Sequence, residues 1–285
     1  MNMHLRAAAA ADAATLGDIC FRAFHTLATA HGFPPDFPNA AAAIGMMRSL
    51  VAHKGFFSVV AEIDGKVVGS NFLDARGPIS AVGPITVDPA VQNDGIGRAM
   101  MEAVLQRSRE LNLPGIRLVQ AGYHNRSLAL YLRLGFTARE HLACLQGTAI
   151  GKSVPGKVVR PATAADIPGC NALCLRVHGH TRSGELADAV ATGTARIVHN
   201  GARITGYTTA LAFFGHAVGE SNDDLQALLG AAEAFPGAGV LVPTRNSDLM
   251  RWCLGEKLRI TQTLTLMSNG LYNEPSGAWL PSILY

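Results

Sequence analysis

The stretch Ile85-Thr86-Val87-Asp88-Pro89-Ala90-Val91-Gln92-Asn93-Asp94-Gly95-Ile96-Gly97-Arg98-Ala99-Met100 decides the fold. An apolar, β-branched run ends at a proline, and a short polar turn with two glycines follows. A helix is predicted from Arg98 to Leu111, because apolar residues recur there at helical spacing. The unpaired N–H groups and the dipole of a helix N-terminus attract anions. Gly95 and Gly97 lack a Cβ, so a phosphate can approach the backbone closely.

Two other nucleotide-binding motifs fit the sequence less well. A dinucleotide fingerprint needs a third glycine three residues after the second, and Met100 stands there instead. A P-loop needs a glycine five residues before Gly151-Lys152-Ser153, and that position holds Gln146. The glycine-rich turn can then be an anion-binding turn or a plain helix cap.

A second block of sequence follows the glycine-rich turn. Ile116 to Val119 is typical of a short strand, and His124 to Leu134 is typical of a helix that ends at Gly135, a residue suited to the left-handed position. The pattern Asn125-x3-Ala-x-Tyr131-x3-Gly-Phe follows Gln-x-x-Gly-x-Gly at a defined interval. Together the two motifs resemble the acyl-CoA-binding motifs of the GNAT superfamily of N-acyltransferases.

The resemblance implies a place for the acyl-CoA. It would lie in a V-shaped split between a strand from Ser80 to Val87 and the strand that ends near Val119. Backbone groups would pair with the pantetheine arm, amides of the turn would hold the pyrophosphate, and Asn125 would hold the pantetheine or a water. The residues assigned to acyl-CoA in this way are Ile85, Thr86, Val87, Gln92, Asn93, Asp94, Gly95, Ile96, Gly97, Arg98 and Asn125.

Tyr131 is the candidate general acid. By resemblance it faces the thioester sulfur, where the leaving thiolate needs a proton. A phenol has an unperturbed pKa of about 10, close enough to that of a thiol for transfer in the transition state. A core tyrosine on an amphipathic helix is the alternative interpretation.

The general base is not identified by the sequence. Many GNAT enzymes carry a glutamate on the strand before the loop, but Ala81 to Val87 contains no carboxylate. Asp74, His25 and His31 are candidates, and each also reads as a surface or capping residue. A chain of waters held by backbone carbonyls is a further alternative.

A loop rich in proline and aromatic residues runs from His31 to Pro38. By resemblance this region borders the acyl acceptor, so His31, Phe33 and Phe37 are assigned to substrate binding. Ligand pockets are mostly apolar with a few polar groups, and two phenylalanines that anchor the loop to the core are the alternative. The acceptor is expected to be a small-molecule amine or a peptide amine.

The chain contains a weak internal repeat. Arg6, Asp12, Cys20 and Arg22 recur 154 residues later as Arg160, Asp166, Cys174 and Arg176. Hairpin signals at Asp64-Gly65 and Asn200-Gly201, and the pairs Asn125/Tyr131 and Asn246/Trp252, continue the parallel. A repeat of this length predicts two related domains.

The second copy lacks the chemistry of the first. Its counterpart of the turn, Val218 to Leu225, is acidic and would repel a pyrophosphate, and Trp252 cannot deliver a proton as Tyr131 can. We therefore expect a GNAT-like catalytic domain at residues 1–150 and a degenerate GNAT-like domain at 157–285. The fold class is α+β, and each domain is a mixed, mostly antiparallel sheet flanked by helices.

Composition excludes several other classes of protein. The 285 residues are 48% hydrophobic, contain no apolar run long enough for a membrane span, and have a net charge of +3, too weak to indicate nucleic acid. The five cysteines form no CxxC pair, so reduced thiols in a cytoplasm are expected. The motifs indicate no metal.

Three functions compete at this point. The first is an acetyl-CoA-dependent N-acyltransferase, the second a non-catalytic acyl-CoA-binding sensor, and the third an interaction scaffold without CoA. Tyr131 favours the enzyme, the absent strand carboxylate favours the sensor, and the complete turn from Gln92 to Gly97 argues against the scaffold. A homodimer is compatible with the sequence.

The last segment, Gly277 to Tyr285, is unusually apolar for a chain end. Frayed ends are usually polar, because nothing offsets their ordering entropy. Burial of Trp279 and Leu280 would supply that offset, so the segment is predicted to dock in the second sheet or across the gap between the halves.

Overall fold

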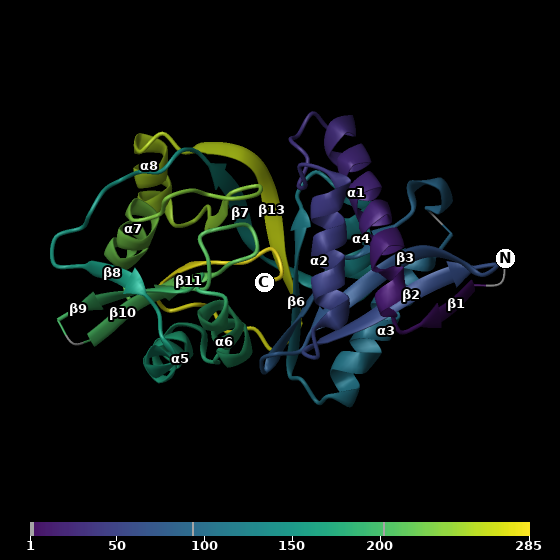
Figure 1. The fold of residues 1–285 in the computed structure, drawn as a ribbon, viewed down its shortest axis with the longest axis horizontal. Helices are drawn as coiled ribbons and strands as arrows, with labels where there is room; N and C mark the ends of the chain where they lie inside the picture. Colours follow the sequence, from purple (N-terminus) through teal and green to yellow (C-terminus); the bar gives the residue numbers. More distant parts are fainter. Residues whose placement is uncertain (1–2, 93, 202) are drawn as a thin grey trace.

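The computed structural model describes residues 3–92, 94–201 and 203–285. Two halves lie side by side along the longest axis of the molecule, the N-terminal one in purple and blue and the C-terminal one mainly in green (Figure 1). Both contain β-sheet with helices packed against it, and nearly all strand pairs are antiparallel. The predicted fold class is confirmed.

The N-terminal half alternates helices and strands around one sheet. Helices α1 and α2 pack on one face, through Leu16 and Met47, and helices α3 and α4 on the other, through Met100 and Tyr131. The elements are β1 (Met3–Arg6), η1 (Ala10–Asp12), α1 (Ala13–Ala30), α2 (Ala40–Ala52), β2 (Phe56–Ile63), β3 (Lys66–Asp74), β4 (Ile79–Val82), β5 (Thr86–Val87), η2 (Pro89–Val91), α3 (Ile96–Glu110), β6 (Gly115–Ala121), α4 (Asn125–Arg133) and β7 (Thr137–Gln146).

The C-terminal half repeats this order with shorter pieces. Helices α5 and α6 pack on one face of its sheet and α7 and α8 on the other. The elements are β8 (Val158–Pro161), η3 (Ala164–Asp166), α5 (Ile167–His178), α6 (Ser183–Ala191), β9 (Arg196–Asn200), β10 (Arg203–Thr208), β11 (Ala217–Gly219), α7 (Asn222–Gly230), β12 (Val240–Pro243), α8 (Ser247–Gly255), β13 (Arg259–Gly270) and β14 (Ala278–Leu280).

Matching ion pairs occur in the two halves. Arg6 binds Asp12 at 2.7 Å, and Arg160 binds Asp166 at 2.6 Å, in both cases beside a short 3-10 turn. Further along, Arg22 of α1 binds Asp88 after β5, and Arg176 of α5 binds Glu220 after β11, both at 2.9 Å. The two halves therefore share local contacts as well as element order.

The two halves exchange their last strands. β13 lies between β6 and β7, and β7 lies between β13 and β12, so the sheet runs in the order β6-β13-β7-β12. β13 pairs with β6 from Leu264↔Ala121 to Gly270↔Gly115, and β12 pairs with β7 from Val240↔Leu145 to Pro243↔Leu142. Figure 1 shows β13 as the long curved strand at the junction of the halves. Backbone hydrogen bonds thus join the halves into one unit, and the boundary predicted near residue 150 remains a prediction.

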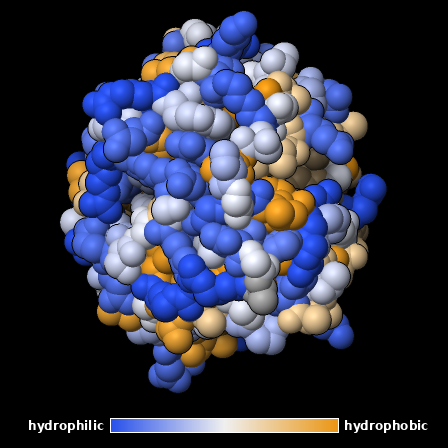
Figure 2. Space-filling view, turned by 90° about the vertical axis from the view of Figure 1, so that its left-hand side faces the viewer, coloured by the Kyte–Doolittle hydropathy of each residue, from blue (hydrophilic) through white to orange (hydrophobic). Residues whose placement is uncertain are grey.

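All five cysteines are buried and unpaired. Within the described residues, no helix combines the length and the apolar content that crossing a membrane requires. Figure 2 shows the face of the C-terminal half, where apolar residues form small separate patches among hydrophilic ones.

The apolar chain end docks as predicted. β14 pairs antiparallel with β11, and Trp279 and Leu280 are 5% and 3% exposed. Beyond the strand, Tyr285 is 3% exposed, and its hydroxyl lies 3.0 Å from His180 Nε2. Its ring lies 4.1 Å from the guanidinium carbon of Arg117 and 4.4 Å from that of Arg182. Both predicted locations are therefore occupied, because the segment joins the second sheet and reaches the junction of the halves.

Candidate acyl-CoA and acceptor site

The first component of the site is a split between strands β4 and β6. The two strands pair in parallel only from Ile79↔Gly115 to Ala81↔Arg117. At Gly83 the backbone adopts a φ of +136°, which favours glycine, and the chain leaves its neighbour. Its pairing with β6 ends there, while the chain stays beside β3 and continues as β5; β6 continues to Ala121 alongside β13. The single strand predicted from Ser80 to Val87 is therefore two strands, and the split opens beside the second.

The second component is the glycine-rich turn at the start of α3. Gly95 is the N-cap of the helix and has a φ of +79°, a left-handed conformation that glycine adopts without strain. A Cβ at Gly95 would meet no atom within 4 Å, so the space above the turn is open. The helix starts at Ile96, two residues before the predicted start, which places the first free N–H groups directly at the turn.

Polar side chains fix the turn to its neighbours. Gln92 Nε2 donates a hydrogen bond to the carbonyl oxygen of Val87 at 3.1 Å. Arg126 of α4 donates to Gln92 Oε1 at 2.9 Å, which brings a guanidinium beside the turn. Free helix N–H groups and this cation make the surroundings favourable for a phosphate.

The residues assigned to acyl-CoA lie around this split and turn. Thr86 is buried, and its hydroxyl has no hydrogen-bond partner among the described residues. Asn125 is the first residue of α4, whose N-cap is His124, and Arg98 is exposed and paired with Glu102 at 2.8 Å. Asn93 lies outside the described residues. The others follow the chain from strand to helix: Ile85, Val87, Gln92, Asp94, Gly95, Ile96 and Gly97.

Tyr131 faces the sheet from α4. It is 7% exposed and packs with Phe136, with 6.1 Å between ring centroids. No described residue hydrogen-bonds its hydroxyl, and burial raises the pKa of the phenol above its ordinary value. Tyr131 therefore stays protonated at neutral pH, as a proton donor must, although desolvation also makes it a weaker acid.

The three candidate bases from the sequence are in unsuitable surroundings. Asp74 is held by Arg76, with 2.9 Å between Oδ1 and Nε. His25 and His31 are exposed, and His31 Nδ1 lies 2.9 Å from the carbonyl oxygen of Leu27. An ion-paired carboxylate is stabilised in its charged form and is a poor proton acceptor. The structure brings none of the three into contact with Tyr131.

The aromatic loop between α1 and α2 divides into two parts. Phe33 stacks on Tyr123, with centroids 4.4 Å apart, and His31 lies 5.0 Å from the same ring. Phe37 is 8% exposed and packs into the core with Phe24. Phe33 and His31 therefore wall the end of β6, and Phe37 anchors the loop. Tyr123 follows β6 directly and had no motif to mark it.

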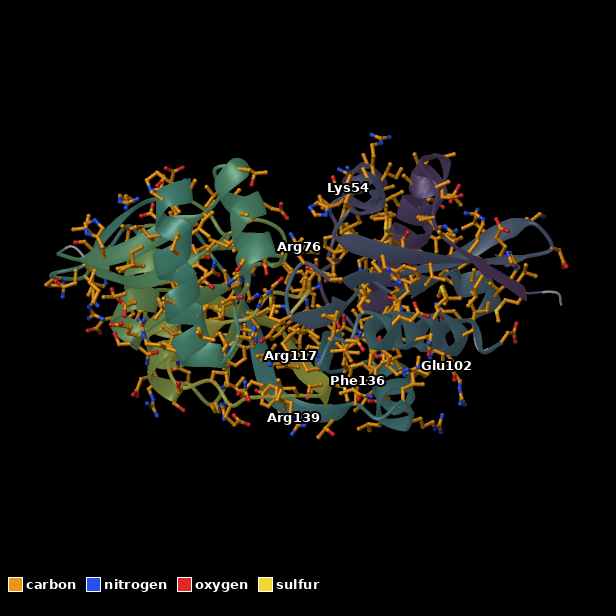
Figure 3. All side chains as sticks on the ribbon, turned by 90° about the horizontal axis from the view of Figure 1, so that it is seen from below. Lys54, Arg76, Glu102, Arg117, Phe136 and Arg139 are labelled. Atoms are coloured by element: carbon orange, nitrogen blue, oxygen red, sulfur yellow. The ribbon has the colours of Figure 1, made fainter. Side chains whose placement is uncertain are left out.

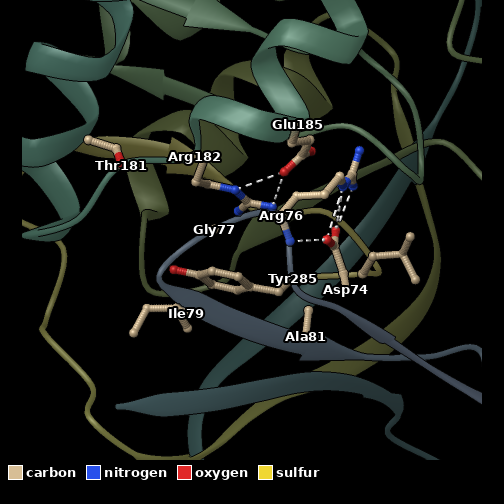
Figure 4. A pocket seen from close by; sticks show the side chains of 10 residues that line it. Asp74, Arg76, Gly77, Ile79, Ala81, Thr181, Arg182, Glu185 and Tyr285 are labelled. Carbon is tan, nitrogen blue, oxygen red and sulfur yellow. Dashed lines mark hydrogen bonds and ion pairs between the residues drawn. The ribbon is translucent and has the colours of Figure 1, made fainter. Parts of the chain in front are cut away.

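A small cavity at the junction of the halves is lined by Asp74, Arg76, Arg182, Glu185 and Tyr285. Its volume is about 20 Å³, which is enough for roughly one water. Figure 4 shows Arg76 bound to Asp74 and Arg182 bound to Glu185 across it, and Figure 3 places Arg76 where the two halves meet. Arg76 also binds Asp188 of α6 at 2.7 Å, which joins the two halves, and a cavity of this size is too small for a substrate.

The counterpart of the turn in the C-terminal half is shorter and filled. α7 starts two residues after Glu220, whereas α3 starts eight residues after the equivalent Asp88. Ser221 and Asp224 form a capping box, in which Asp224 Oδ2 accepts a hydrogen bond of 3.0 Å from the backbone N–H of Ser221. Asp224 is fully buried and binds Lys157 Nζ at 2.6 Å. The carboxylate of Asp224 therefore takes the place of an anion at this helix N-terminus.

The second split is occupied by the chain itself. β14 pairs with β11 from Ala217↔Leu280 to Gly219↔Ala278 and packs beside β12. What remains is an open hollow lined by residues that include Glu220, Glu274 and Arg245. Arg245 is bound to Glu140 and Glu274, so its charge is neutralised. Among the residues the structure describes, no cluster of His, Cys, Asp and Glu side chains could hold a metal.

Comparisons with known proteins agree with this geometry. The family model described as the acetyltransferase (GNAT) family matches residues 24–136. A mycothiol acetyltransferase from Amycolatopsis mediterranei is 35% identical over 95 residues, 30% of this chain. The chain spans only 31% of the length of that relative.

Solved structures extend the likeness of the fold to both halves. A predicted acetyltransferase from Pyrococcus horikoshii matches 96% of this chain and 91% of its own, with a TM-score of 0.74 and 18% identity. A GCN5-related N-acetyltransferase from Sphaerobacter thermophilus matches 97% and 98%, with a TM-score of 0.61 and 14% identity. At these identities the likeness shows the fold alone. Residues 24–136, less than half of the chain, therefore carry the likeness to the GNAT family of acetyltransferases.

Proposed function

We propose that this chain is an N-acetyltransferase that transfers the acetyl group of acetyl-CoA to a primary amine, at a single site in its N-terminal half. The observation that carries the proposal is the split between β5 and β6, beside which the space above Gly95 at the N-terminus of α3 is open. The catalytic unit is the proposed domain 1–150, completed by β13 from the proposed degenerate domain 157–285. The buried, unpaired cysteines suit a cytoplasmic location, and a homodimer remains a prediction.

Each part of acetyl-CoA has residues suited to it. Amides from Asp94 to Arg98 would bind the pyrophosphate, assisted by Arg126 beside the turn. The free edge of β5 would pair with the amide groups of the pantetheine. Tyr131 would donate its proton to the sulfur as the carbon–sulfur bond breaks, because burial keeps its phenol protonated.

A non-catalytic acyl-CoA-binding module is the second candidate. It is favoured by the base candidates from the sequence, since Asp74 is bound to Arg76 and both histidines are exposed. The two candidates differ in what they do with an amine. An acetyl-CoA assay against a panel of primary amines distinguishes them, because only an enzyme releases free CoA when an amine is added.

Binding itself is tested on the purified protein. Mass spectrometry under native conditions should find bound CoA, and titration calorimetry should give one acetyl-CoA per chain. Absence of binding in both measurements would contradict the enzyme and the sensor together.

A further inference from the structure

Asp36 stands apart from every other partly buried carboxylate of the described residues. It lies in the loop between α1 and α2, is not exposed, and forms no ion pair. All other Asp and Glu side chains that are not exposed are paired with Lys, Arg or His. These are Asp12, Glu62, Asp74, Asp88, Glu140, Asp166, Glu185, Asp188, Glu220, Asp224 and Glu256.

The contacts of Asp36 are neutral. Its Oδ1 accepts a hydrogen bond of 3.4 Å from Nε2 of Gln262, a residue of β13 that is 4% exposed. The titratable groups that face it are the thiols of Cys20 and Cys144 and the phenol of Tyr123. Burial raises the pKa of the Asp36 carboxyl above its ordinary value. One long hydrogen bond does not offset the desolvation of a carboxylate.

The position of Asp36 connects it to the proposed site. Tyr123 follows the C-terminal end of β6, the strand that forms one side of the open split, and precedes Asn125 by two residues. Phe33 and His31, from the same loop as Asp36, pack against the Tyr123 ring. Asp36 therefore lies close to the end of the split, where the loop, β6 and the exchanged strand β13 meet.

A primary ammonium group is a ligand that would supply the positive charge missing around Asp36. It would neutralise the carboxylate, and the rings of Phe33 and Tyr123 accept both cations and the apolar carbons of an amine. A protein retains an unfavourable buried charge where function requires it.

We propose that Asp36 binds the protonated amine of the acyl acceptor, and that Gln262 orients its carboxylate. The proposal rests on the proposed N-acetyltransferase function, and it names the substrate class as a cationic primary amine with an apolar or aromatic neighbour. It also assigns a task to the C-terminal half, since Gln262 reaches the site only because the two halves exchange strands.

The first test compares the stability of two matched variants at neutral pH. Asp36→Asn removes the charge and preserves the shape, so the melting temperature should rise by a few degrees. Glu233→Gln is the control, because Glu233 is exposed and forms no ion pair with a described residue, and its melting temperature should not change. A fall in the melting temperature of Asp36→Asn would show a structural role and overturn the proposal.

The second test measures amine binding without acetyl-CoA. n-Butylamine and 2-phenylethylamine hydrochlorides should raise the melting temperature of the wild type, while the neutral 2-phenylethanol should not. Asp36→Asn should lose at least tenfold in amine affinity, and Gln262→Met, which keeps the length and removes the donor, about threefold. No shift with either amine, or equal shifts in wild type and Asp36→Asn, would overturn the proposal.

Calorimetry with acetyl-CoA separates this proposal from the proposed function. Asp36→Asn should bind acetyl-CoA within twofold of the wild type, and in turnover its KM for the amine should rise at least tenfold with a smaller change in kcat. A wild type that binds amines through Asp36 and does not bind acetyl-CoA would contradict the proposed function alone. Full kcat/KM for the amine in Asp36→Asn would contradict the role of Asp36 alone.

Discussion

Each half contains a split between two of its strands, and only the C-terminal half fills this split with a strand of its own. In the first half, β5 pairs with β3 and leaves its other edge facing the gap toward β6. In the second half, the equivalent strand β11 pairs on that edge with β14, which packs beside β12. The position that a pantetheine arm would take in one half is held by the chain's own backbone in the other.

The helix that follows each split shows the same contrast. Gly95 caps α3 without a side chain, and no described side chain bonds its first N–H groups, whereas Ser221 and Asp224 form a capping box at the start of α7. The ion pairs Arg22–Asp88 and Arg176–Glu220 are kept in both halves. The ion pairs therefore maintain the fold in both halves, and the residues after Asp88 or Glu220 decide whether a ligand has room.

The largest expected effect comes from removing residues 279–285. These residues are the last part of the segment that fills the second split. Trp279, Leu280 and Tyr285 are all at most 5% exposed, and each fully buried large side chain contributes roughly 1.5–3 kcal/mol. We expect a loss of about 4 kcal/mol or more, which corresponds to a melting temperature lower by about 10 °C. Differential scanning calorimetry measures this loss.

The same truncated variant tests whether the second split can bind acetyl-CoA once its filling strand is removed. If the shortened turn of α7 is enough to prevent binding, the variant still binds one acetyl-CoA per chain. A second equivalent site in titration calorimetry would show that β14 alone had blocked the second split. An unchanged melting temperature would contradict the energetic role of the segment.

The next effect concerns Tyr131 and its counterpart Trp252. Tyr131→Phe keeps the ring packing and removes the proton, so kcat should fall on the order of 10²-fold with little change in the affinity for acetyl-CoA. Trp252→Phe is the matched control in the second half and should leave kcat unchanged. Steady-state kinetics under conditions where chemistry limits the rate decide the matter, and full activity of Tyr131→Phe would remove it from the mechanism.

A third effect concerns the two turns. Gly95→Val introduces a β-branched side chain where φ is +79° and fills the open space above the turn. The affinity for acetyl-CoA should fall more than tenfold, about 1.4 kcal/mol. Glu220→Gln, before the turn of α7, should leave the affinity unchanged. Equal losses in the two variants would show that both halves take part in binding.

The sequence predicted the parts of this comparison that depend on local rules. A strand before Gly95 and a helix after it predict a glycine turn at a helix N-terminus, and the structure has that arrangement, while anion binding there stays a prediction. The repeat of Arg6 and Asp12 at Arg160 and Asp166 predicted equivalent structures, and the same ion pairs are present.

The parts that the sequence did not predict depend on long-range pairing. An alternating apolar pattern shows that β7 and β13 are strands, but it does not show which half each one joins. Both β4 and β5 pair with β3, and the break between them lies at Gly83, where φ is +136°; the continuous apolar run conceals this break. Asp36 was missed because a carboxylate in a polar, proline-rich loop reads as exposed, and only the packing of β13 makes it buried.

The smallest expected effect compares the two ion pairs of the repeat. Hydrogen bonds from Arg6 and Arg160 hold the pKa of Asp12 and of Asp166 below their ordinary values. A carboxylate with a lowered folded-state pKa stabilises the fold above its unfolded pKa of about 3.9, and this contribution disappears as the pH falls through the folded-state pKa. The free energy of unfolding should therefore decline below about pH 4.

Asp12→Asn and Asp166→Asn should each lower stability at pH 7 and weaken this decline. The effect should be larger for Asp166, whose side chain is 8% exposed against 12% for Asp12. Urea unfolding at pH 7 and pH 3 measures both quantities, and a stability difference that does not depend on pH in either variant would contradict the electrostatic origin of the two pairs.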